Sequence, residues 1–321
     1  MRNMLFAFQE HIQEHAAEAA HGAGEKFSAG KTIIEHVTNS GREHPLLHLP
    51  TIAGIDFSVT KHVLMLWLVA GGVLLLLTAL VRTYRRQTKN GGVPSGPAAG
   101  LEYVVELIRD FIVTPNVGGK WMPTWAPLIL TLFFFIFAAN AIGLIPVFEV
   151  LALLDHFVLH TADGSFLKQV IHGGTTATAN FNVTAGLATV TFFAIIAAGT
   201  RAHGFLAHWK NLVPGGVSKF VYPILIPIEI MGMFVRPFAL TMRLAANMTG
   251  GHIAILSILS FVFLFAQMAG KALVGIGIGV AISLPMAAGI SLLEVIVVLV
   301  QAYVFTLLTA VFVGMAIHAH H

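Results

Sequence analysis

The stretch that decides the fold runs from Pro237 to His252 and reads PFALTMRLAANMTGGH. It carries one arginine, Arg243, in apolar surroundings long enough to be embedded in a membrane. An arginine inside a bilayer costs at least ~2.5–3.5 kcal/mol, so its presence predicts a functional site. On a helix, the face of Arg243 would carry only small neighbours: Ala239, Ala246, Gly250 and Ala254. We therefore expect a close-packed partner there; the alternative is an arginine near a helix end that snorkels to the headgroups.

The composition predicts an all-α polytopic membrane protein. Hydrophobic residues make up 56% of the 321 residues and charged residues only 10%, whereas a soluble domain carries about 25% charged residues. The net charge is +3. Because the basic residues gather in loops, we interpret them as a sign of membrane topology and expect no nucleic-acid partner. The absence of cysteine excludes disulfides, thiolate metal sites and cysteine nucleophiles.

The first transmembrane helix is expected within residues 61–90, after a polar N-terminal extension at 1–60. Residues 63–81 are uncharged, and this length suits the apolar core of a bilayer. Four basic residues follow at once: Arg82, Arg85, Arg86 and Lys89. By the positive-inside rule this end is cytoplasmic, which places the N-terminus outside.

The middle of the chain is expected to cross the membrane twice more. Residues 91–120 read as a cytoplasmic loop, in which 101–113 would form an amphipathic helix on the membrane surface. Residues 121–200 read as a transmembrane pair around an external loop at 149–180. Basic residues at 201–219 then mark a second cytoplasmic loop.

The last segment, residues 220–317, contains two apolar stretches that are too long for upright helices. Residues 220–270 carry only three charged side chains and residues 272–317 only one, whereas an upright span needs about 20 residues. Neither stretch has a polar turn midway. We therefore expect a hairpin of two long, strongly tilted helices that turns near Gly270 and Lys271. Pro237 is expected to bend the first helix, and Pro285 to bend or interrupt the second.

The polar residues of the two long helices share one register. In an antiparallel hairpin, the residue numbers of two facing residues add up to a nearly constant sum. The sum is 546 for His252 and Glu294, and it is 544 for Arg243 and Gln301. We therefore expect each pair to lie at one depth. Because His252 falls half a turn from the face of Arg243, the arginine would face an outside partner and the histidine the second helix.

These residue types suit proton transfer in two steps. Histidine, glutamate and glutamine can relay protons or line a water path, whereas arginine effectively never deprotonates and acts as a barrier. The sequence predicts one half-path from the outside past His252 and Glu294, and another past Glu229 to the cytoplasm. Arg243 would separate them, and a moving carboxylate of another protein would join them.

These residues strongly resemble subunit a of the F-type ATP synthases. The resemblance covers roughly residues 33–317 and is carried by ALTMRLAANMTGGH at 239–252 with Glu294 and Gln301 downstream. Further matching segments are Pro227-Ile228-Glu229, Arg236-Pro237, NAIGLIP at 140–146, ATANFN at 177–182 and Lys61-His62. The resemblance implies a subunit that is not an enzyme by itself, holds no cofactor and couples proton flow to rotation and ATP synthesis.

The resemblance also implies partners and a location. The two tilted helices would lie against the ring of c subunits, and the complex would add b-type peripheral stalk subunits and the F1 catalytic head. The chain would sit in the lipid bilayer of the bacterial plasma (inner) membrane as a multi-pass protein, with its C-terminus in the cytoplasm.

Residue roles follow from the same resemblance. Arg243 corresponds to the essential rotor-facing arginine, His252 and Glu294 to the outside half-channel, and Glu229 to an acid of the cytoplasmic half-channel. Gln301 and Asn247 match polar neighbours of the arginine. The small rotor-facing residues would be Ala239, Ala246 and Gly250. Arg236 and Asn180 are secondary candidates. At Asn180 many members carry an acid, so this chain departs from the family pattern there.

Two other classes of membrane protein were weighed. A proton-coupled secondary transporter also needs intramembrane charges, but such folds usually contain paired repeats, and residues 1–150 hold no counterpart of the 237–252 stretch. A membrane-embedded hydrolase would need a nucleophile with a base or a metal motif, and neither G-x-S-x-G nor H-E-x-x-H occurs.

Overall fold

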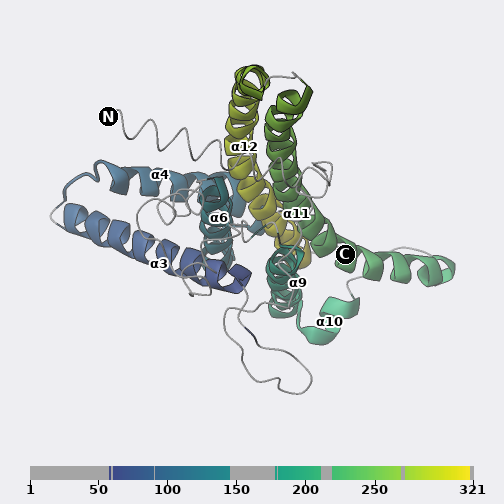
Figure 1. The fold of residues 1–321 in the computed structure, drawn as a ribbon. Coiled ribbons are helices and arrows are strands. Elements are labelled where there is room, and N and C mark those ends of the chain that lie inside the picture. Colours follow the sequence, from purple (N-terminus) through teal and green to yellow (C-terminus); the bar gives the residue numbers. More distant parts are fainter. Residues whose placement is uncertain are drawn as a thin grey trace.

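The computed structural model describes a helical membrane protein. The described residues are 58, 61–89, 91–144, 178, 180–210, 219–268 and 272–318. In chain order their elements are α3 (Lys61–Thr88), α4 (Pro97–Ile108), the π-helical segment η1 (Arg109–Val113), α5 (Thr114–Val117), α6 (Met122–Leu144), α9 (Phe181–His203), α10 (Phe205–Lys210), the 3-10 turn η4 (Lys219–Val221), α11 (Tyr222–Met268) and α12 (Ala272–Ile317). No strand occurs among these residues, and Figure 1 shows their arrangement.

Five of the described helices are long and apolar enough to cross a membrane, so the chain is a multi-pass membrane protein. The expected spans coincide with α3, α6 and α9, and the expected hairpin coincides with α11 and α12. Almost all of the N-terminal extension, almost all of the external loop and the turn of the hairpin lie outside the described residues.

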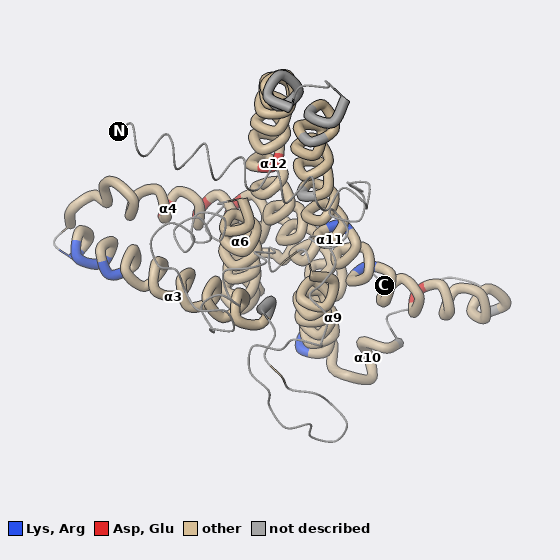
Figure 2. Tube along the Cα trace, in the orientation of Figure 1, with Lys and Arg blue, Asp and Glu red and all other residues tan. Residues whose placement is uncertain are grey.

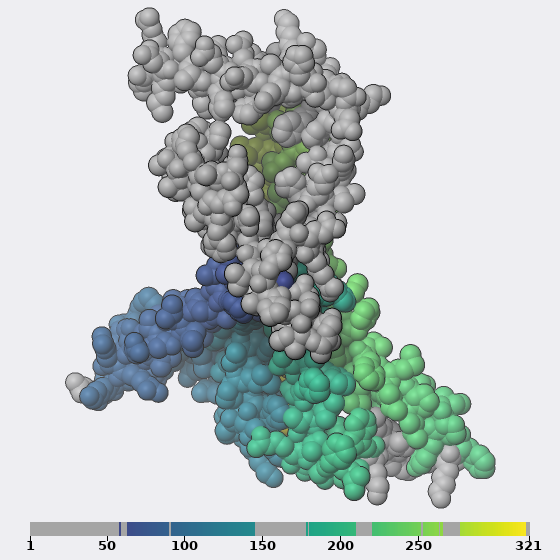
Figure 3. Space-filling view, turned by 60° about the horizontal axis from the view of Figure 1, so that its bottom comes forward, coloured from purple at the N-terminus to yellow at the C-terminus, as the bar shows by residue number. Residues whose placement is uncertain are grey.

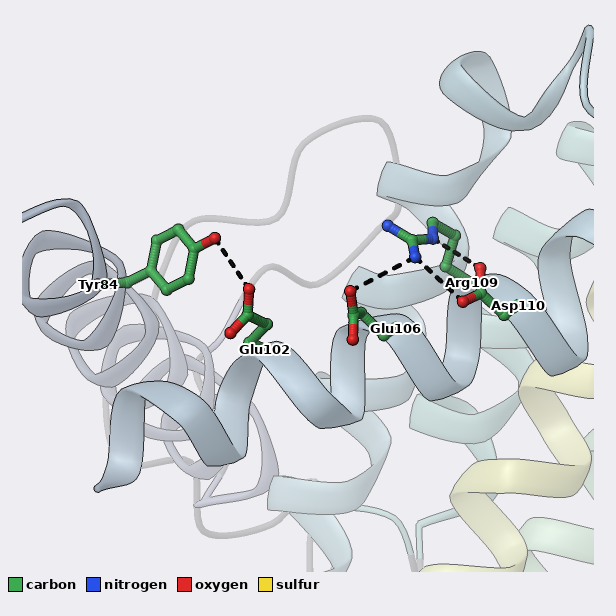
Figure 4. Close-up of polar contacts among 5 residues, drawn as sticks. All are labelled: Tyr84, Glu102, Glu106, Arg109 and Asp110. Atoms are coloured by element: carbon green, nitrogen blue, oxygen red, sulfur yellow. Dashed lines mark hydrogen bonds and ion pairs between the residues drawn. The ribbon is translucent and has the colours of Figure 1, made fainter. Parts of the chain in front are cut away.

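The helices α3 and α4 form an arm that extends to one side of the central helices (Figures 1 and 3). The phenol of Tyr84 on α3 donates a hydrogen bond of 3.0 Å to the carboxylate of Glu102 on α4 (Figure 4). Much of α3 is exposed, including Leu74 and Leu75, which are 68% and 73% exposed. Leucines in this position suit contact with lipid tails or with another membrane helix.

A helix forms where the amphipathic surface helix was predicted, with different bounds, and its place at the membrane surface stays a prediction. It begins at Pro97 and passes into the π-helical segment, where Ile112 and Val113 are fully buried. Its other side is charged. Arg109 lies 2.7 Å from Asp110 and 3.6 Å from Glu106 (Figure 4), and its hydrogen bond holds the pKa of Asp110 below the usual value.

The π-helical turn has a local cause. Pro115 has no N–H to donate, and its ring clashes with an ordinary helix that continues from the preceding turn. The backbone N–H of Thr114, just before it, donates to the carbonyl of Arg109, five residues back. This wider turn lets the chain restart as α5 with the proline in its first turn, where a missing N–H costs little.

The helix α12 lies at the centre of the protein. It packs against α11, α6, α9 and α5, and its buried residues include Ala302, Phe305, Ala310 and Val313. Figure 1 shows that the C-terminal part of α11 and the N-terminal part of α12 lie side by side. They contain 47 and 46 residues, which correspond to about 70 Å each, more than twice the ~30 Å core of a bilayer.

The prolines interrupt neither long helix. The helix α11 continues through Pro227 and Pro237, and α12 continues through Pro285. In Figure 1, the N-terminal part of α11 runs away from the central helices, and the rest of α11 then turns and follows α12. A long helix that bends in this way can follow a curved partner surface.

Candidate functional site

The arginine singled out in the sequence lies on an exposed face of α11. Arg243 is exposed, and so are its neighbours on that face: Ala239, Ala246, Asn247 and Gly250. The opposite side of the same turns is buried, with Leu240 at 1% exposure and Leu244 at 0%. The periodicity of α11 therefore directs the arginine away from the rest of the chain. Figure 2 shows how sparse charges are along the hairpin.

No ion pair neutralises Arg243 in the described part of the chain, where the arginines that pair with acids are Arg109 and Arg236. A guanidinium with small neighbours can be approached closely by another helix. An uncompensated charge in a membrane helix calls for a counter-charge. The described part of the chain does not supply this counter-charge to Arg243.

Contacts across the hairpin agree with the expected register. Gly279 lies against Val262, Glu294 against Gly251 and Phe312 against Arg236. The residue numbers of these pairs add up to between 541 and 548, close to the values expected from the sequence. The two long helices are therefore antiparallel over most of their length.

Gln301 is held within the hairpin beside the arginine face. Its side chain is only 3% exposed, and its Oε1 accepts a hydrogen bond of 3.0 Å from Nδ2 of Asn247. Asn247 lies one turn beyond Arg243 on the same face of α11. The two residues matched to polar neighbours of the arginine thus form a bridge between α11 and α12.

Glu294 points at the backbone of α11. A Cβ at Gly251 would overlap the Glu294 carboxyl group, so this carboxyl group lies where only a glycine leaves room for it. The next residue along α11 is His252. The side chain of His252 lies outside the described residues, so the pairing of His252 with Glu294 stays a prediction.

Glu229 and Arg236 form the other polar contact of the hairpin. Nη2 of Arg236 lies 3.4 Å from Oε1 of Glu229. The guanidinium also lies over the ring of Phe312 on α12, with its Cζ 5.5 Å from the ring centroid. These contacts lie near the start of α11 and the end of α12.

Three buried polar side chains were not identified as site residues from the sequence. Asn140 on α6, Thr178 just before α9 and Ser283 on α12 are each 0% exposed, and their polar atoms have no hydrogen-bond partner among the residues that the structure describes. Buried polar atoms of this kind usually bind ordered water. In the sequence, a buried polar site of this kind can be recognised by an amide side chain within a long apolar span. Asn140 in the NAIGLIP segment is such an amide.

Thr178 lies just before α9, which packs against α12, the helix that carries Glu294. The helices α9 and α12 run in parallel, since Thr191 and Thr309 lie 3.3 Å apart and His203 contacts the carbonyl of Ile317 further along both helices.

Asn180 has a structural role. It is the N-cap of α9, and its Oδ1 accepts a hydrogen bond of 2.8 Å from the backbone N–H of Asn182. Asparagine is among the preferred N-cap residues because its side chain satisfies a free N–H of the first turn. The side-chain oxygen at this position thus caps the start of α9.

Comparison with known proteins identifies the family of this chain. The family model described as ATP synthase A chain matches residues 63–314. ATP synthase subunit a 2 of Chlorobium luteolum is 38% identical over 94% of this chain and 79% of its own length. ATP synthase subunit a of Chloroherpeton thalassium is 38% identical over 96% and 86%, and that of Myxococcus xanthus 38% identical over 83% and 75%. The chain therefore belongs to the ATP synthase A chain family.

Proposed function

We propose that this chain is the non-catalytic membrane subunit of an F-type ATP synthase that passes protons through two offset half-channels at the surface of a c-subunit ring. Proton flow would turn the ring and drive ATP synthesis in the F1 catalytic head. The b-type subunits of the peripheral stalk would hold the chain against rotation. Membership of the ATP synthase A chain family supports this role.

The observation that carries the proposal is the exposed arginine on a face of small residues. An ionised carboxylate on a ring helix would supply the charge that Arg243 lacks within the described part of its own chain. The neighbours Ala246 and Gly250 leave room for that helix to approach. Arginine favours the ionised form of a nearby carboxylate and cannot pass on a proton itself, so it would block a direct leak.

The two acids of the hairpin lie on opposite sides of Arg243 along α11. Glu229 is fourteen residues before Arg243, which corresponds to about 21 Å of helix. Glu294 lies against Gly251, eight residues after Arg243, which corresponds to about 12 Å. This separation supports two half-channels that meet only at the arginine.

The outside half-channel would pass Glu294 and His252. Asn140 on α6, Thr178 just before α9 and Ser283 on α12 have polar atoms without a hydrogen-bond partner among the described residues, and both α6 and α9 pack against α12. Each would bind water in the path, since a buried hydroxyl or amide without a partner is costly. The cytoplasmic half-channel would pass Glu229.

The proposed orientation places the N-terminus outside and the C-terminus in the cytoplasm, in a bacterial plasma membrane. Five spans are an odd number, which puts the two ends of the described chain on opposite sides. Arg85 and Arg86 lie in the last turn of α3, and Arg201 lies in the last turn of α9. In this orientation the C-terminal ends of α3 and α9 both lie in the cytoplasm, as the positive-inside rule requires.

Photo-cross-linking tests the proposed ring contact. The chain has no cysteine, so Ala246→Cys introduces a single site for a benzophenone maleimide within this subunit. We expect irradiation of the intact complex to join this site to a c subunit, as identified by mass spectrometry. Leu75→Cys on the exposed side of α3 is the control and should give no such adduct. Equal adducts from both sites, or none from Ala246→Cys, would contradict the proposal.

A further inference from the structure

We propose that Arg236 is a positioning residue that holds the Glu229 carboxylate on the face of α11 leading to Arg243, and that the ring of Phe312 holds Arg236 in place. The inference rests on the proposed function, in which Glu229 serves the cytoplasmic half-channel. It adds a three-residue chain of contacts that ties this acid to the opposite helix of the hairpin.

The Arg236 side chain reaches back along α11 towards Glu229. Its Nη2 lies 3.4 Å from Oε1 of Glu229, seven residues earlier, which is the direction in which side chains on a helix lean. Gly232 lies between them, and an added Cβ there would be 3.9 Å from the same Nη2. The guanidinium therefore lies along the surface of α11, beside Gly232.

The other side of the guanidinium is fixed by α12. The 5.5 Å from its Cζ to the Phe312 ring centroid is within the ~6 Å limit for a cation–π contact. Phe312 is partly buried and packs against the hydrophobic core, so the ring has a stable position. The Arg236 side chain is accordingly the less exposed partner, at 24% against 36% for Glu229.

A positioned acid is useful in a half-channel because a glutamate side chain has three rotatable bonds and many alternative orientations. Arg236 cannot relay the proton itself, since guanidinium does not deprotonate in proteins. The N–O distance of 3.4 Å is longer than the ~2.7–2.9 Å of a tight charge-assisted hydrogen bond. Arg236 therefore orients Glu229 and still leaves its carboxylate free to accept a proton.

Other groups near this end of α11 do not perform this role in the described part of the chain. The charged or titratable side chains described on the packed helices are Arg201 and His203 on α9, and Glu294 and Tyr303 on α12. None of them forms an ion pair with Glu229, whose described partner is Arg236.

The test measures the initial rate of ATP-driven proton uptake by inverted membrane vesicles that contain the assembled complex. We expect Arg236→Met to slow uptake by roughly two- to tenfold, the lower part of the range of coupling between residues in contact. Arg236→Lys should restore at least half of the rate, because it returns the charge and part of the reach. Arg86→Met on α3 is the matched control and should leave the rate unchanged.

Double variants separate positioning from a general effect on folding. Phe312→Leu should slow the parent complex and should have no further effect when combined with Arg236→Met. Glu229→Asp withdraws the carboxylate, so Arg236→Met should add little to it. If Arg236→Met fails to co-purify with the ring, the pair of Phe312→Leu and Glu229→Asp provides the same comparison.

Two results would overturn the inference: an Arg236→Lys complex as slow as Arg236→Met, or effects that simply multiply in the double variants. Arg243→Ala, measured in parallel, separates this inference from the proposed function. If uptake is lost in Arg243→Ala while the Arg236 series behaves like the parent, only the positioning role is wrong. If Arg243→Ala pumps normally, the proposed function itself is wrong.

Discussion

Asn247 donates a hydrogen bond of 3.0 Å to Gln301, and this bond crosses from one long helix of the hairpin to the other. The two residues are 54 positions apart in the chain. Asn247 shares the exposed face of Arg243, whereas Gln301 is buried. The bond thus fixes the two helices relative to each other one turn from the arginine.

The first prediction concerns this bridge. Asn247→Leu would leave the buried Oε1 of Gln301 without its donor, which costs about 1–3 kcal/mol. We expect a lower midpoint of thermal unfolding for the purified complex. The double variant Asn247→Leu/Gln301→Leu should recover part of the loss, because it leaves no unpaired polar group. A double variant that is less stable than Asn247→Leu alone would show that the hydrogen bond is not the source of the effect.

A second prediction concerns the contact between Gly251 and Glu294. Gly251→Ala places a methyl group where the Glu294 carboxyl group lies, and the flexible end of the glutamate must move. We expect ATP-driven proton uptake to fall by roughly ten- to hundredfold, as for other small misplacements of reacting groups, with thermal stability nearly unchanged. Gly186→Ala on α9 is the control, since nothing lies within 4 Å of its added Cβ. Parent-like uptake in Gly251→Ala would mean that the carboxyl position is unimportant.

A third prediction concerns the end of α12. A Cβ at Gly314 would overlap the backbone carbonyl of Asn116 in α5, and a backbone group cannot turn aside as a side chain can. Gly314→Ala should therefore destabilise the protein by about 1–3 kcal/mol, as overpacking usually does. Thermal unfolding of the purified complex measures this effect. Gly277→Ala on the same helix, where nothing lies within 4 Å, should be neutral or stabilising, and equal losses in both variants would contradict the packing argument.

The fourth prediction is a pH dependence at the end of α9. His208 on α10 is buried against Gly199, and burial, with repulsion from His203, lowers its pKa. When α10 detaches, His208 regains an ordinary pKa of about 6.5 and binds a proton more readily. The packing of α10 should therefore be at full strength above about pH 6.5 and should weaken as the pH falls below it.

Amide hydrogen exchange measures this effect. After correction for the intrinsic pH dependence of exchange, protection of residues 205–210 should decrease between about pH 7.5 and pH 5.5, which bracket the reference pKa. In His208→Leu, which cannot take up a proton, protection should stay constant over this range. A parent protein with constant protection would show that the buried histidine does not govern this contact.

Much of the fold could be predicted because it depends on patterns along one helix. The length of the apolar stretches indicates α11 and α12, and the seven-residue spacing of Glu229, Arg236 and Arg243 places them in one stripe. The spacing of polar residues in both long helices also predicted their relative register. Asn180 could have been identified as a cap, because asparagine directly before an apolar helix is a recognised start signal.

The rest depends on contacts between distant segments, which no local pattern reveals. The stacking of Arg236 on Phe312 joins residues 76 positions apart, and the sequence offers no reason to prefer that ring to others. The unpartnered amide of Asn140 is distinctive only because packing buries it completely. The glycine contacts at 251 and 314 likewise require the positions of two helices to be known.

The central claim is that Arg243 controls proton passage at the surface of the ring. The most direct test is ATP-driven acidification of inverted vesicles that contain the Arg243→Ala complex. The control is Arg86→Ala, which removes an arginine from α3 instead. Co-purification with the ring and the catalytic head verifies assembly. We predict that the Arg243→Ala complex assembles and does not pump, while Arg86→Ala pumps like the parent. An assembled Arg243→Ala complex that acidifies vesicles at the parental rate would contradict the account.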